Sequence, residues 1–428
     1  MKLRNRRVAI ALTMMAAIVT GCNLDDKYDG PEMPTDPSAL ELTPVELELV
    51  DHSNDFAFNL FKQIIDSRSA DESKKNKSLI VSPISITYAL GMLNNGATGE
   101  TQKQINKVLG FGDAGADGIN NFCRKMLNRA PQLDSLTKVM IANNIYMNKR
   151  YALNSEFTKI ANTYYNAYPE TRDFHDGKTL DVINKWASDH TEEMIKKMLD
   201  DSSFDPDAVS YLLNAIYFKG EWTTKFDKNR TMDETFYHAG DTKELINRPM
   251  MHLGEELEYD EIDGYQVVRL PYGNKTFQMT ILLPIVGENN VNALPAVPSA
   301  KTWSKICRNK WHSYTVQLAL PRIDTSTDIE LREIMAALGM PDAFNPYKAD
   351  FSNFCDKETY IGMMKQVAAI NLDEEGTEAS AVTVIGMINT AYTPAPDIKQ
   401  FYANHPFIYI ISEKSSNAIF FIGQYTGY

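Results

Sequence analysis

The segment 371–383, NLDEEGTEASAVT, has residue types and a spacing that suit the addition of a strand to a sheet. An extended chain points successive side chains to opposite faces. One face of this segment carries only small residues, namely Thr377, Ala379, Ala381 and Thr383. The other face carries Glu378, Ser380 and Val382. Because the small face can enter a β-sheet without burying an ion or a large volume, the pattern predicts a loop that inserts as a strand.

The residues on either side of this segment support that interpretation. The apolar run QVAAINL (366–372) predicts a strand that leads into the loop. Gly376 follows Glu374 and Glu375 and allows the backbone to turn where the loop meets the sheet. An irregular tail, IGMINTAYTPAPDIKQ (385–400), then separates the loop from the next strand-like run.

The usual signatures of catalysis and of nucleotide or metal binding do not occur in this sequence. It contains no GxSxG, HExxH, GxxxxGK[ST] or GxGxxG pattern, and its seven histidines are scattered. The acidic run GEELEYDEID (254–263) lacks the glycine placement of a calcium-binding EF-hand loop, so it is interpreted as a solvated pair of strands. We therefore expect no enzymatic activity, no cofactor and no metal site.

Composition favours one large domain that does not bind polyanions. The chain has 428 residues, 43% of them apolar, and no Gly/Ser- or Pro-rich linker interrupts residues 50–428. Its net charge of −13 argues against nucleic acid and heparin as partners. The nearest basic runs, at 74–77 and 196–198, are short and flanked by acids.

The N-terminus has the pattern of a secretory signal at 1–21, with a positive start and a short apolar stretch. The sequence VTGC resembles a bacterial lipobox, which implies that Cys22 is lipidated. Polar, proline-rich residues follow, so a flexible tether is expected over 22–48 and the folded domain over 49–428. Acids after Cys22 resemble surface-export signals of Bacteroidetes lipoproteins, which implies an outer-membrane lipoprotein exposed at the cell surface. An ordinary secreted protein is the alternative.

Three further cysteines are present: Cys123, Cys307 and Cys355. An odd number cannot all pair within one chain, and none of the three stands in a CxxC pair. Free buried thiols are therefore expected, and a single disulfide stays open as an alternative.

The insertable segment resembles the reactive-loop hinge of the serpins, in which EEGTEAxA is a near-diagnostic pattern. Further serpin-like motifs follow in order from about residue 50: SPISITYALGMLNNGATGETQKQI (82–105), NAIYFKGEW (214–222), RPMM (248–251), LPYGNKTFQMTILLP (270–284), LPRIDTSTDIELREIMAALGMPDAF (320–344) and HPFIYIISEKSSNAIFFIGQY (405–425). The resemblance implies an α+β fold with three β-sheets and about eight to nine helices. It also implies an exposed reactive-centre loop at about 374–400.

Residues 180–200 predict an amphipathic helix. Its expected inward residues are Ile183, Trp186, Met194, Ile195 and Met198. The stretch resembles the serpin helix that packs across the front of the main sheet.

The resemblance implies a suicide-substrate inhibitor of proteases. In serpins the target protease attacks the loop and forms an acyl-enzyme, and the cut hinge then inserts into the main sheet before deacylation. The residues that match the hinge are Glu374, Glu375, Gly376, Thr377, Glu378, Ala379, Ser380, Ala381, Val382 and Thr383. Val382 departs from the usual Ala or Gly but suits a strand, so the small residues favour an inhibitor.

The resemblance also places a polar cluster, the shutter, beneath the point where the main sheet parts. The matching residues are Ser82, Ser85, Asn214 and Gln366. Gln366 stands where the family has a histidine, and glutamine cannot titrate, so pH sensitivity through this site is in doubt. Trp222 matches the tryptophan of the breach, at the top of the opening. Ordinary core packing is the alternative for each of these residues.

The distance at which serpins are usually cut after the hinge acid implies Thr390–Ala391 as the reactive bond, and counting back from the HPF motif implies a position near Ala395. The window 387–395 contains no Lys or Arg, which disfavours trypsin-like targets. Thr390 or Ala391 suits elastase-like pockets. Met387 or Tyr392 suits chymotrypsin-, subtilisin- or cathepsin-like ones, the last being papain-like cysteine proteases.

Two other functions stay open at this point. The loop is longer than in common relatives, which would suit a non-inhibitory serpin that acts as a surface binding or structural module. The lipoprotein signal would also suit a polysaccharide-handling protein, although the aromatic residues fall in core-like patterns. We expect a monomer whose partners are proteases and, through Cys22, a membrane.

Overall fold

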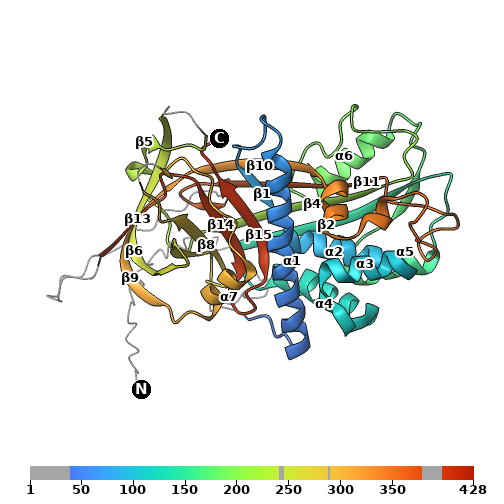
Figure 1. Ribbon diagram of the computed structural model, residues 1–428, viewed down its shortest axis with the longest axis horizontal. Helices are drawn as coiled ribbons and strands as arrows, with labels where there is room; N and C mark the ends of the chain where they lie inside the picture. Colours follow the sequence, from blue (N-terminus) through green and yellow to red (C-terminus); the bar gives the residue numbers. More distant parts are fainter. Residues whose placement is uncertain (1–38, 241–244, 288–289, 378–397) are drawn as a thin grey trace, which may run out of the picture. The chain divides into compact units, whose positions relative to one another are not determined.

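The computed structural model describes residues 39–240, 245–287, 290–377 and 398–428 (Figure 1). Within these ranges the helices are α1 (Pro44–Ser69), α2 (Pro83–Asn94), α3 (Gly99–Leu109), α4 (Gly115–Arg129), α5 (Ser155–Tyr165), α6 (Thr179–Asp189), α7 (Ala300–Arg308) and α8 (Arg332–Leu338). The expected range of eight to nine helices is confirmed.

The strands alternate with these helices along the chain. They are β1 (Leu79–Val81), β2 (Thr137–Asn148), β3 (Glu170–Arg172), β4 (Ser210–Glu221), β5 (Met232–Phe236), β6 (Ile246–Ile262), β7 (Tyr265–Pro271), β8 (Phe277–Pro284), β9 (His312–Pro321), β10 (Ile323–Glu330), β11 (Met363–Leu372), β12 (Gly376–Thr377), β13 (Ile398–Tyr402), β14 (Phe407–Glu413) and β15 (Ile419–Tyr425).

A six-stranded sheet in the order β10-β11-β12-β4-β2-β3 holds the residues that matter for function. β4 lies at its centre and pairs antiparallel with β2 along most of its length. On its other side β4 pairs in parallel with β11. The short strand β12 enters between β11 and β4 at one end of the sheet.

The remaining strands form a nine-stranded sheet in the order β1-β15-β14-β8-β7-β6-β9-β13, with β5 added beside β6. The long strand β6 pairs with β7 near one end and with β5 near the other, and β9 runs along most of its length. β6 therefore joins a larger part of this sheet, made of β1, β15, β14, β8 and β7, to a smaller part made of β5, β9 and β13. Counting the smaller part separately gives the three expected sheets.

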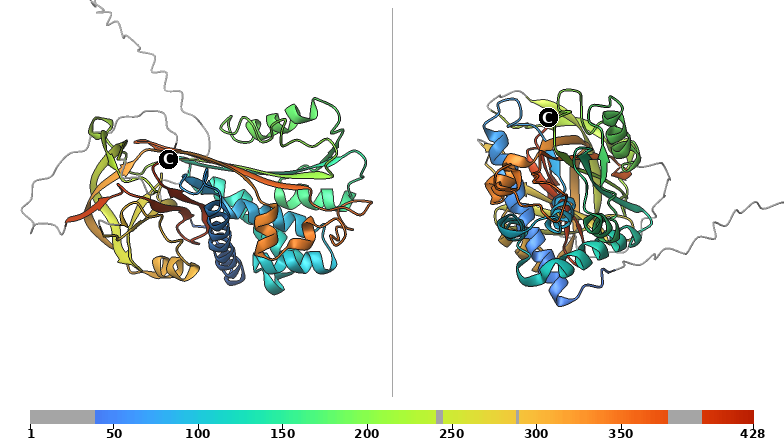
Figure 2. Two further views of the ribbon diagram at one scale, coloured as in Figure 1. Left: turned by 45° about the horizontal axis from the view of Figure 1, so that its top comes forward. Right: turned by 90° about the vertical axis from the view of Figure 1, so that its right-hand side faces the viewer.

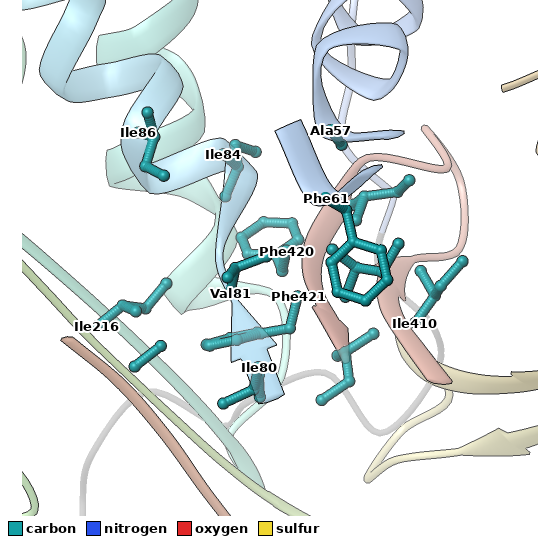
Figure 3. Close-up of a cluster of buried hydrophobic side chains, with 14 of the residues drawn as sticks. Ala57, Phe61, Ile80, Val81, Ile84, Ile86, Ile216, Ile410, Phe420 and Phe421 are labelled. Atoms are coloured by element: carbon teal, nitrogen blue, oxygen red, sulfur yellow. The ribbon is translucent and has the colours of Figure 1, made fainter. Parts of the chain in front are cut away.

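The helices divide between the two faces of the six-stranded sheet. In Figure 2, α6 lies on one face of the long strands, while α1, α2 and α3 lie on the other. Every residue of α2 is buried, which explains why this helix is apolar on all sides. The main core lies around α2, and side chains from α1, β1, β4 and β15 meet there (Figure 3).

The first helix begins earlier than the predicted domain boundary. Thr43 and Glu46 cap each other's backbone N–H groups, and Pro44 fits the first turn because its position needs no donor. The boundary expected at residue 49 therefore falls inside α1, and 44–48 is helix and not tether. The signal segment and Cys22 lie outside the described residues. The same holds for the rest of the predicted tether except residues 39–43.

The helix expected over 180–200 is shorter than predicted. α6 ends at Asp189, and Glu192 and Glu193 then take positive φ angles of 47° and 63°, which turn the chain back. The sequence pattern missed this turn because neither residue is a glycine. Of the residues expected to face inward, three are buried and two half-buried: Ile183, Ile195 and Met198, then Trp186 and Met194.

No helix in the described ranges is both long and apolar enough to cross a lipid bilayer.

Candidate functional site

The first residues of the predicted hinge already form a strand of the six-stranded sheet. Thr377 pairs with Leu372 of β11 on one side and with Gly220 of β4 on the other. Gly376 pairs with Glu221, and Thr377 is fully buried. Residues 378–383 of the hinge, and all the candidate reactive bonds, lie outside the described residues.

Beyond β12 the two neighbouring strands close on each other. β11 and β4 pair directly from Met363 opposite Tyr211 to Ala368 opposite Ile216. A strand that continued from Thr377 toward the middle of the sheet would have to separate these pairs. The boundary between β11 and β4 is therefore the line along which the sheet would open.

Gly376 occupies a position that only glycine fits. Its φ of 151° lies where side chains are strongly disfavoured, and a Cβ there would overlap the carbonyl oxygen of Gly220. The tight turn that delivers it is closed by Asp373 N donating to Gly376 O at 2.8 Å. Glu375 N also donates to Asp373 Oδ1 at 2.8 Å.

Glu374 anchors the start of the hinge through a buried carboxylate, only 1% exposed. Arg322, just before β10, donates to it from Nη2 at 2.6 Å and from Nε at 3.0 Å. The Thr231 hydroxyl donates to the same carboxylate at 2.5 Å. Burial alone would raise the pKa of Glu374, but these hydrogen bonds and the charge of Arg322 outweigh it and hold the pKa below its usual value.

Glu375, the next residue, is bound by two lysines that follow β4. Its carboxylate oxygens lie 2.9 Å from the amines of Lys225 and Lys228, which follow β4. Hydrogen bonds from the two lysines lower the pKa of Glu375. The two adjacent carboxylates thus bind cations from different segments of the chain, Glu374 from the segment before β10 and Glu375 from the segment after β4.

Trp222 and Tyr272 lie directly beside the hinge. Trp222 Nε1 donates to the carbonyl oxygen of Asp373 at 3.0 Å, and its ring stacks on Tyr272 with centroids 4.3 Å apart. The hydroxyls of Tyr272 and Thr377 are 3.0 Å apart. Burial raises the pKa of Tyr272 well above its usual value, so its hydroxyl stays neutral and available for this hydrogen bond.

The four residues predicted for the shutter form one buried hydrogen-bonded cluster. Gln366 Oε1 accepts from Ser82 N at 3.0 Å, and its Nε2 lies 2.6 Å from Asn214 Oδ1 and 2.9 Å from Ser85 Oγ. Ser85 Oγ donates to Asn214 Oδ1 at 2.7 Å. Gln366 and Asn214 are directly opposite each other across the boundary between β11 and β4.

Several residues of this site were not singled out by the sequence pattern, although Tyr272 and Arg322 lie within the serpin-like motifs 270–284 and 320–344. They are Asn143, which accepts from Asn214 Nδ2 at 2.7 Å, and the hinge partners Lys225, Lys228, Thr231, Tyr272 and Arg322. Each reaches the site only through the tertiary fold. Lys225 is 150 residues from its partner Glu375 in the sequence, and Tyr272 is 105 residues from its partner Thr377. Local spacing could not reveal contacts over such distances.

The three cysteines are unpaired in the structure: Cys123, Cys307 and Cys355. Burial raises the pKa of the Cys123 and Cys307 thiols to about 12, which makes them poor nucleophiles. Among the described side chains, no group of three or more His, Cys, Asp or Glu is arranged to hold a metal ion.

Comparison with known proteins agrees with this geometry. The family model described as Serpin (serine protease inhibitor) matches residues 51–427, so the chain belongs to the serpin family. Human Serpin B11 is 31% identical over 395 residues, covering 86% of this chain and 97% of the relative. An uncharacterized serpin-like protein of Methanosarcina acetivorans is 28% identical, covering 89% of this chain and 86% of the relative.

Among solved structures, the chain is similar to tengpin, a thermophilic serpin, in its native state. The TM-score is 0.79 at 29% identity, covering 91% of this chain and 96% of tengpin. The serpin fold expected from the sequence is therefore confirmed. Serpins are typically protease inhibitors, and some members of the family do not inhibit.

Proposed function

We propose that this serpin is a suicide-substrate inhibitor of serine proteases with elastase-like, chymotrypsin-like or subtilisin-like specificity, extending to papain-like cysteine proteases. One observation carries the proposal. Thr377, the first small residue of the hinge, already lies as a buried strand residue between Leu372 and Gly220. A hinge that starts inside the sheet has a defined entry line, and the small residues after it meet no charge barrier.

The chemistry of trapping would be carried out by the target's own nucleophile. It attacks the carbonyl of the reactive bond, the bond breaks, and an acyl-enzyme forms while the new amino terminus leaves. The freed hinge then continues from Thr377 between β11 and β4. In doing so it separates the pairs from Ala368 to Met363, and it breaks the hydrogen bond between Gln366 and Asn214.

The anchors described above give the insertion a fixed starting point. Glu374 is held by Arg322 on the β10 side, and Glu375 is held by Lys225 and Lys228 on the β4 side. We infer that these contacts keep the base of the loop in place while the remainder moves. Under this proposal the chain itself performs no catalysis and needs no cofactor or metal.

For the reactive bond we propose Thr390–Ala391, with Met387, Tyr392 and Ala395 as alternatives. The support is the absence of Lys and Arg from the window 387–395 and the count from the hinge acid Glu374. Elastase is therefore the first protease to test, followed by chymotrypsin, subtilisin and papain.

The test is incubation of residues 39–428 with elastase, read by denaturing gel and intact mass. A covalent complex at the summed mass, with release of a C-terminal peptide, is the expected result, and the peptide's mass identifies the bond. Cleavage by the whole protease panel with no complex would contradict inhibition. If the cleaved form also melted at an unchanged temperature, the loop would not insert, which would favour a non-inhibitory binding or structural module.

We also propose that Cys22 carries the lipid of an outer-membrane lipoprotein exposed at the cell surface, which would place the inhibitor where external proteases act. The support is the VTGC sequence after a signal-like segment. Expression of the full chain and of Cys22→Ser, followed by detergent phase partitioning, tests this. The wild type should enter the detergent phase and the variant should not. Equal partitioning would contradict lipidation.

A further inference from the structure

The turn that brings Tyr272 to the hinge is bound to the end of β4. Residues 272–276, between β7 and β8, are called the Tyr272 turn below. Gly273 N donates to the carbonyl oxygen of Glu221 at 2.8 Å. The Thr223 hydroxyl donates to the carbonyl oxygen of Gly273 at 2.9 Å. One side of the turn is therefore fixed to the residues that flank Trp222.

The other side of the Tyr272 turn is bound to the segment 133–137, where β2 begins. Asn274 N donates to Asp134 Oδ2 at 3.3 Å, and Asn274 Nδ2 donates to the carbonyl oxygen of Leu133 at 2.9 Å. The same segment also binds the end of β4, because Glu221 N donates to the carbonyl oxygen of Leu136 at 3.1 Å. Three chain segments thus bind one another, and the hinge enters the sheet beside them.

Asp134 lies where these segments meet, and its side chain is buried, only 2% exposed. Its Oδ1 accepts from Leu136 N at 3.0 Å, and its Oδ2 accepts from the Thr137 hydroxyl at 2.6 Å as well as from Asn274 N. Both oxygens of a carboxylate accept hydrogen bonds, whereas an amide has one acceptor oxygen. A carboxylate can therefore bind Leu136 N and Asn274 N at the same time, which an asparagine could not do.

Gly273 brings the backbone of the turn directly against this carboxylate. Its φ of 44° lies in the left-handed region, and a Cβ on it would be 2.0 Å from Asp134 Oδ2. The space that a side chain at position 273 would need is thus occupied by Asp134. The carboxylate therefore sets how closely the Tyr272 turn approaches the start of β2.

We propose that Asp134 is a positioning residue that fixes the Tyr272 turn and, through the Tyr272 hydroxyl, holds Thr377 ready to continue into the sheet. The hydroxyls of Tyr272 and Thr377 are 3.0 Å apart in a buried place, so a small shift of the turn would break their hydrogen bond. The consequence for trapping rests on the proposed inhibitory function. A hinge that is not held should insert more slowly after cleavage, which gives the acyl-enzyme more time to hydrolyse.

Hydrogen exchange in the intact chain tests the role of Asp134 without any protease. Asp134→Asn should speed exchange at the buried Thr377 amide by about fivefold or more, because the turn loses an acceptor. Tyr272→Phe should act in the same direction, and the double variant should exchange no faster than Tyr272→Phe alone. Asp356→Asn is the matched control, since this exposed carboxylate accepts from Ala152 N, a hydrogen bond that an amide oxygen can keep.

A general loss of stability would speed exchange to the same degree with and without the Tyr272 hydroxyl. Such independence would overturn the proposal, because it would mean that Asp134 does not act through Tyr272. Unchanged exchange in Asp134→Asn would overturn it as well.

Gly273→Ala covers the case in which Asp134→Asn does not fold. The added Cβ should push the turn away from the carboxylate while Asp134 keeps its bonds to Leu136 and Thr137, so the Thr377 amide should again exchange about fivefold faster or more. Gly264→Ala is the matched control, because its φ of 86° is also left-handed but a Cβ there meets nothing within 4 Å. Equal exchange in the two glycine variants would overturn the proposal.

The stoichiometry of inhibition of elastase tests the consequence for trapping. It should rise in Asp134→Asn and stay unchanged in Asp356→Asn. Faster exchange at Thr377 with an unchanged stoichiometry would overturn the link between this contact and trapping. If the wild type traps no protease at all, the proposed function fails, while the exchange measurements on the intact chain still decide the role of Asp134.

Discussion

The hydroxyl of Thr377 lies 3.0 Å from the hydroxyl of Tyr272, and the ring of Tyr272 stacks against Trp222. This contact joins the first inserted residue of the hinge to the turn between β7 and β8, away from the two strands that flank it. The hinge is thus held by side-chain contacts as well as by the sheet. The contact is also open to measurement, because each partner can be changed separately.

A double-mutant cycle with Tyr272→Phe and Thr377→Val should show that these two residues interact. Each single change removes one hydroxyl of a buried pair, so each should lower the free energy of unfolding by about 1 kcal/mol or slightly more. The double variant should lose less than the sum, because both variants remove the same hydrogen bond. Urea unfolding measures all four proteins. Strictly additive losses would mean that the hydrogen bond does not stabilise the hinge.

Thr377→Arg should abolish trapping and leave a cleavable substrate. The position is fully buried, so an arginine there would have to bury a charge without a partner or keep the hinge out of the sheet. The ratio of cleaved product to covalent complex with elastase measures this. Thr235→Arg on β5 is the matched control, since Thr235 is exposed. Unchanged complex formation by Thr377→Arg would falsify insertion along this line.

Gly376→Ala should destabilise the entry of the hinge. The added Cβ would overlap the carbonyl oxygen of Gly220, and the φ of 151° is itself unfavourable for alanine. We expect a loss of about 2 kcal/mol in the free energy of unfolding, together with faster amide exchange at Thr377. Gly177→Ala is the control, because a Cβ there meets nothing within 4 Å. Equal stability of the two variants would contradict the tight approach described here.

The anchor at Glu374 predicts a loss of stability in acid. Its folded pKa lies below the usual value of 4.5, so its contribution to stability is fully present above that value and is lost as the pH falls through the folded pKa. Urea unfolding between about pH 3 and 7 should show this fall. Glu374→Gln should be less stable than the wild type at neutral pH, and the difference should shrink in acid. A difference that is constant with pH would mean that the charge of Glu374 contributes nothing.

The shutter predicts a response to histidine at position 366. Gln366 cannot titrate, so this cluster should add no pH dependence between about pH 5 and 8 in the wild type. In Gln366→His, burial without a carboxylate should lower the folded pKa of the histidine below that of the unfolded chain. Stability should then fall as the pH drops below about 6.5. Chemical unfolding at several pH values measures the slope, and parallel curves for both proteins would disprove the expectation.

The sequence was sufficient for the family and the approximate helix number, and it predicted the hinge. These features depend on local order: small residues at every second position from Thr377 onward, a glycine before them, and motifs in fixed succession. The shutter residues Ser82, Ser85, Asn214 and Gln366 were found through resemblance to the family. The helical pattern failed at the end of α6. Glu192 and Glu193 take positive φ angles there, and a hydrogen bond from the Thr191 hydroxyl to Ala187 O holds the turn.

What the sequence by itself determined is the alternation of small side chains in the segment 374–383, from which its insertion as a strand is predicted, because alternation and side-chain size are properties of neighbouring residues. Only the tertiary structure decided where that strand begins and what holds it. Glu374 meets Thr231, which is 143 residues away, and Thr377 meets Tyr272, which is 105 residues away. Such contacts depend on the pairing of distant strands, and no short-range pattern encodes which buried side chain will face which.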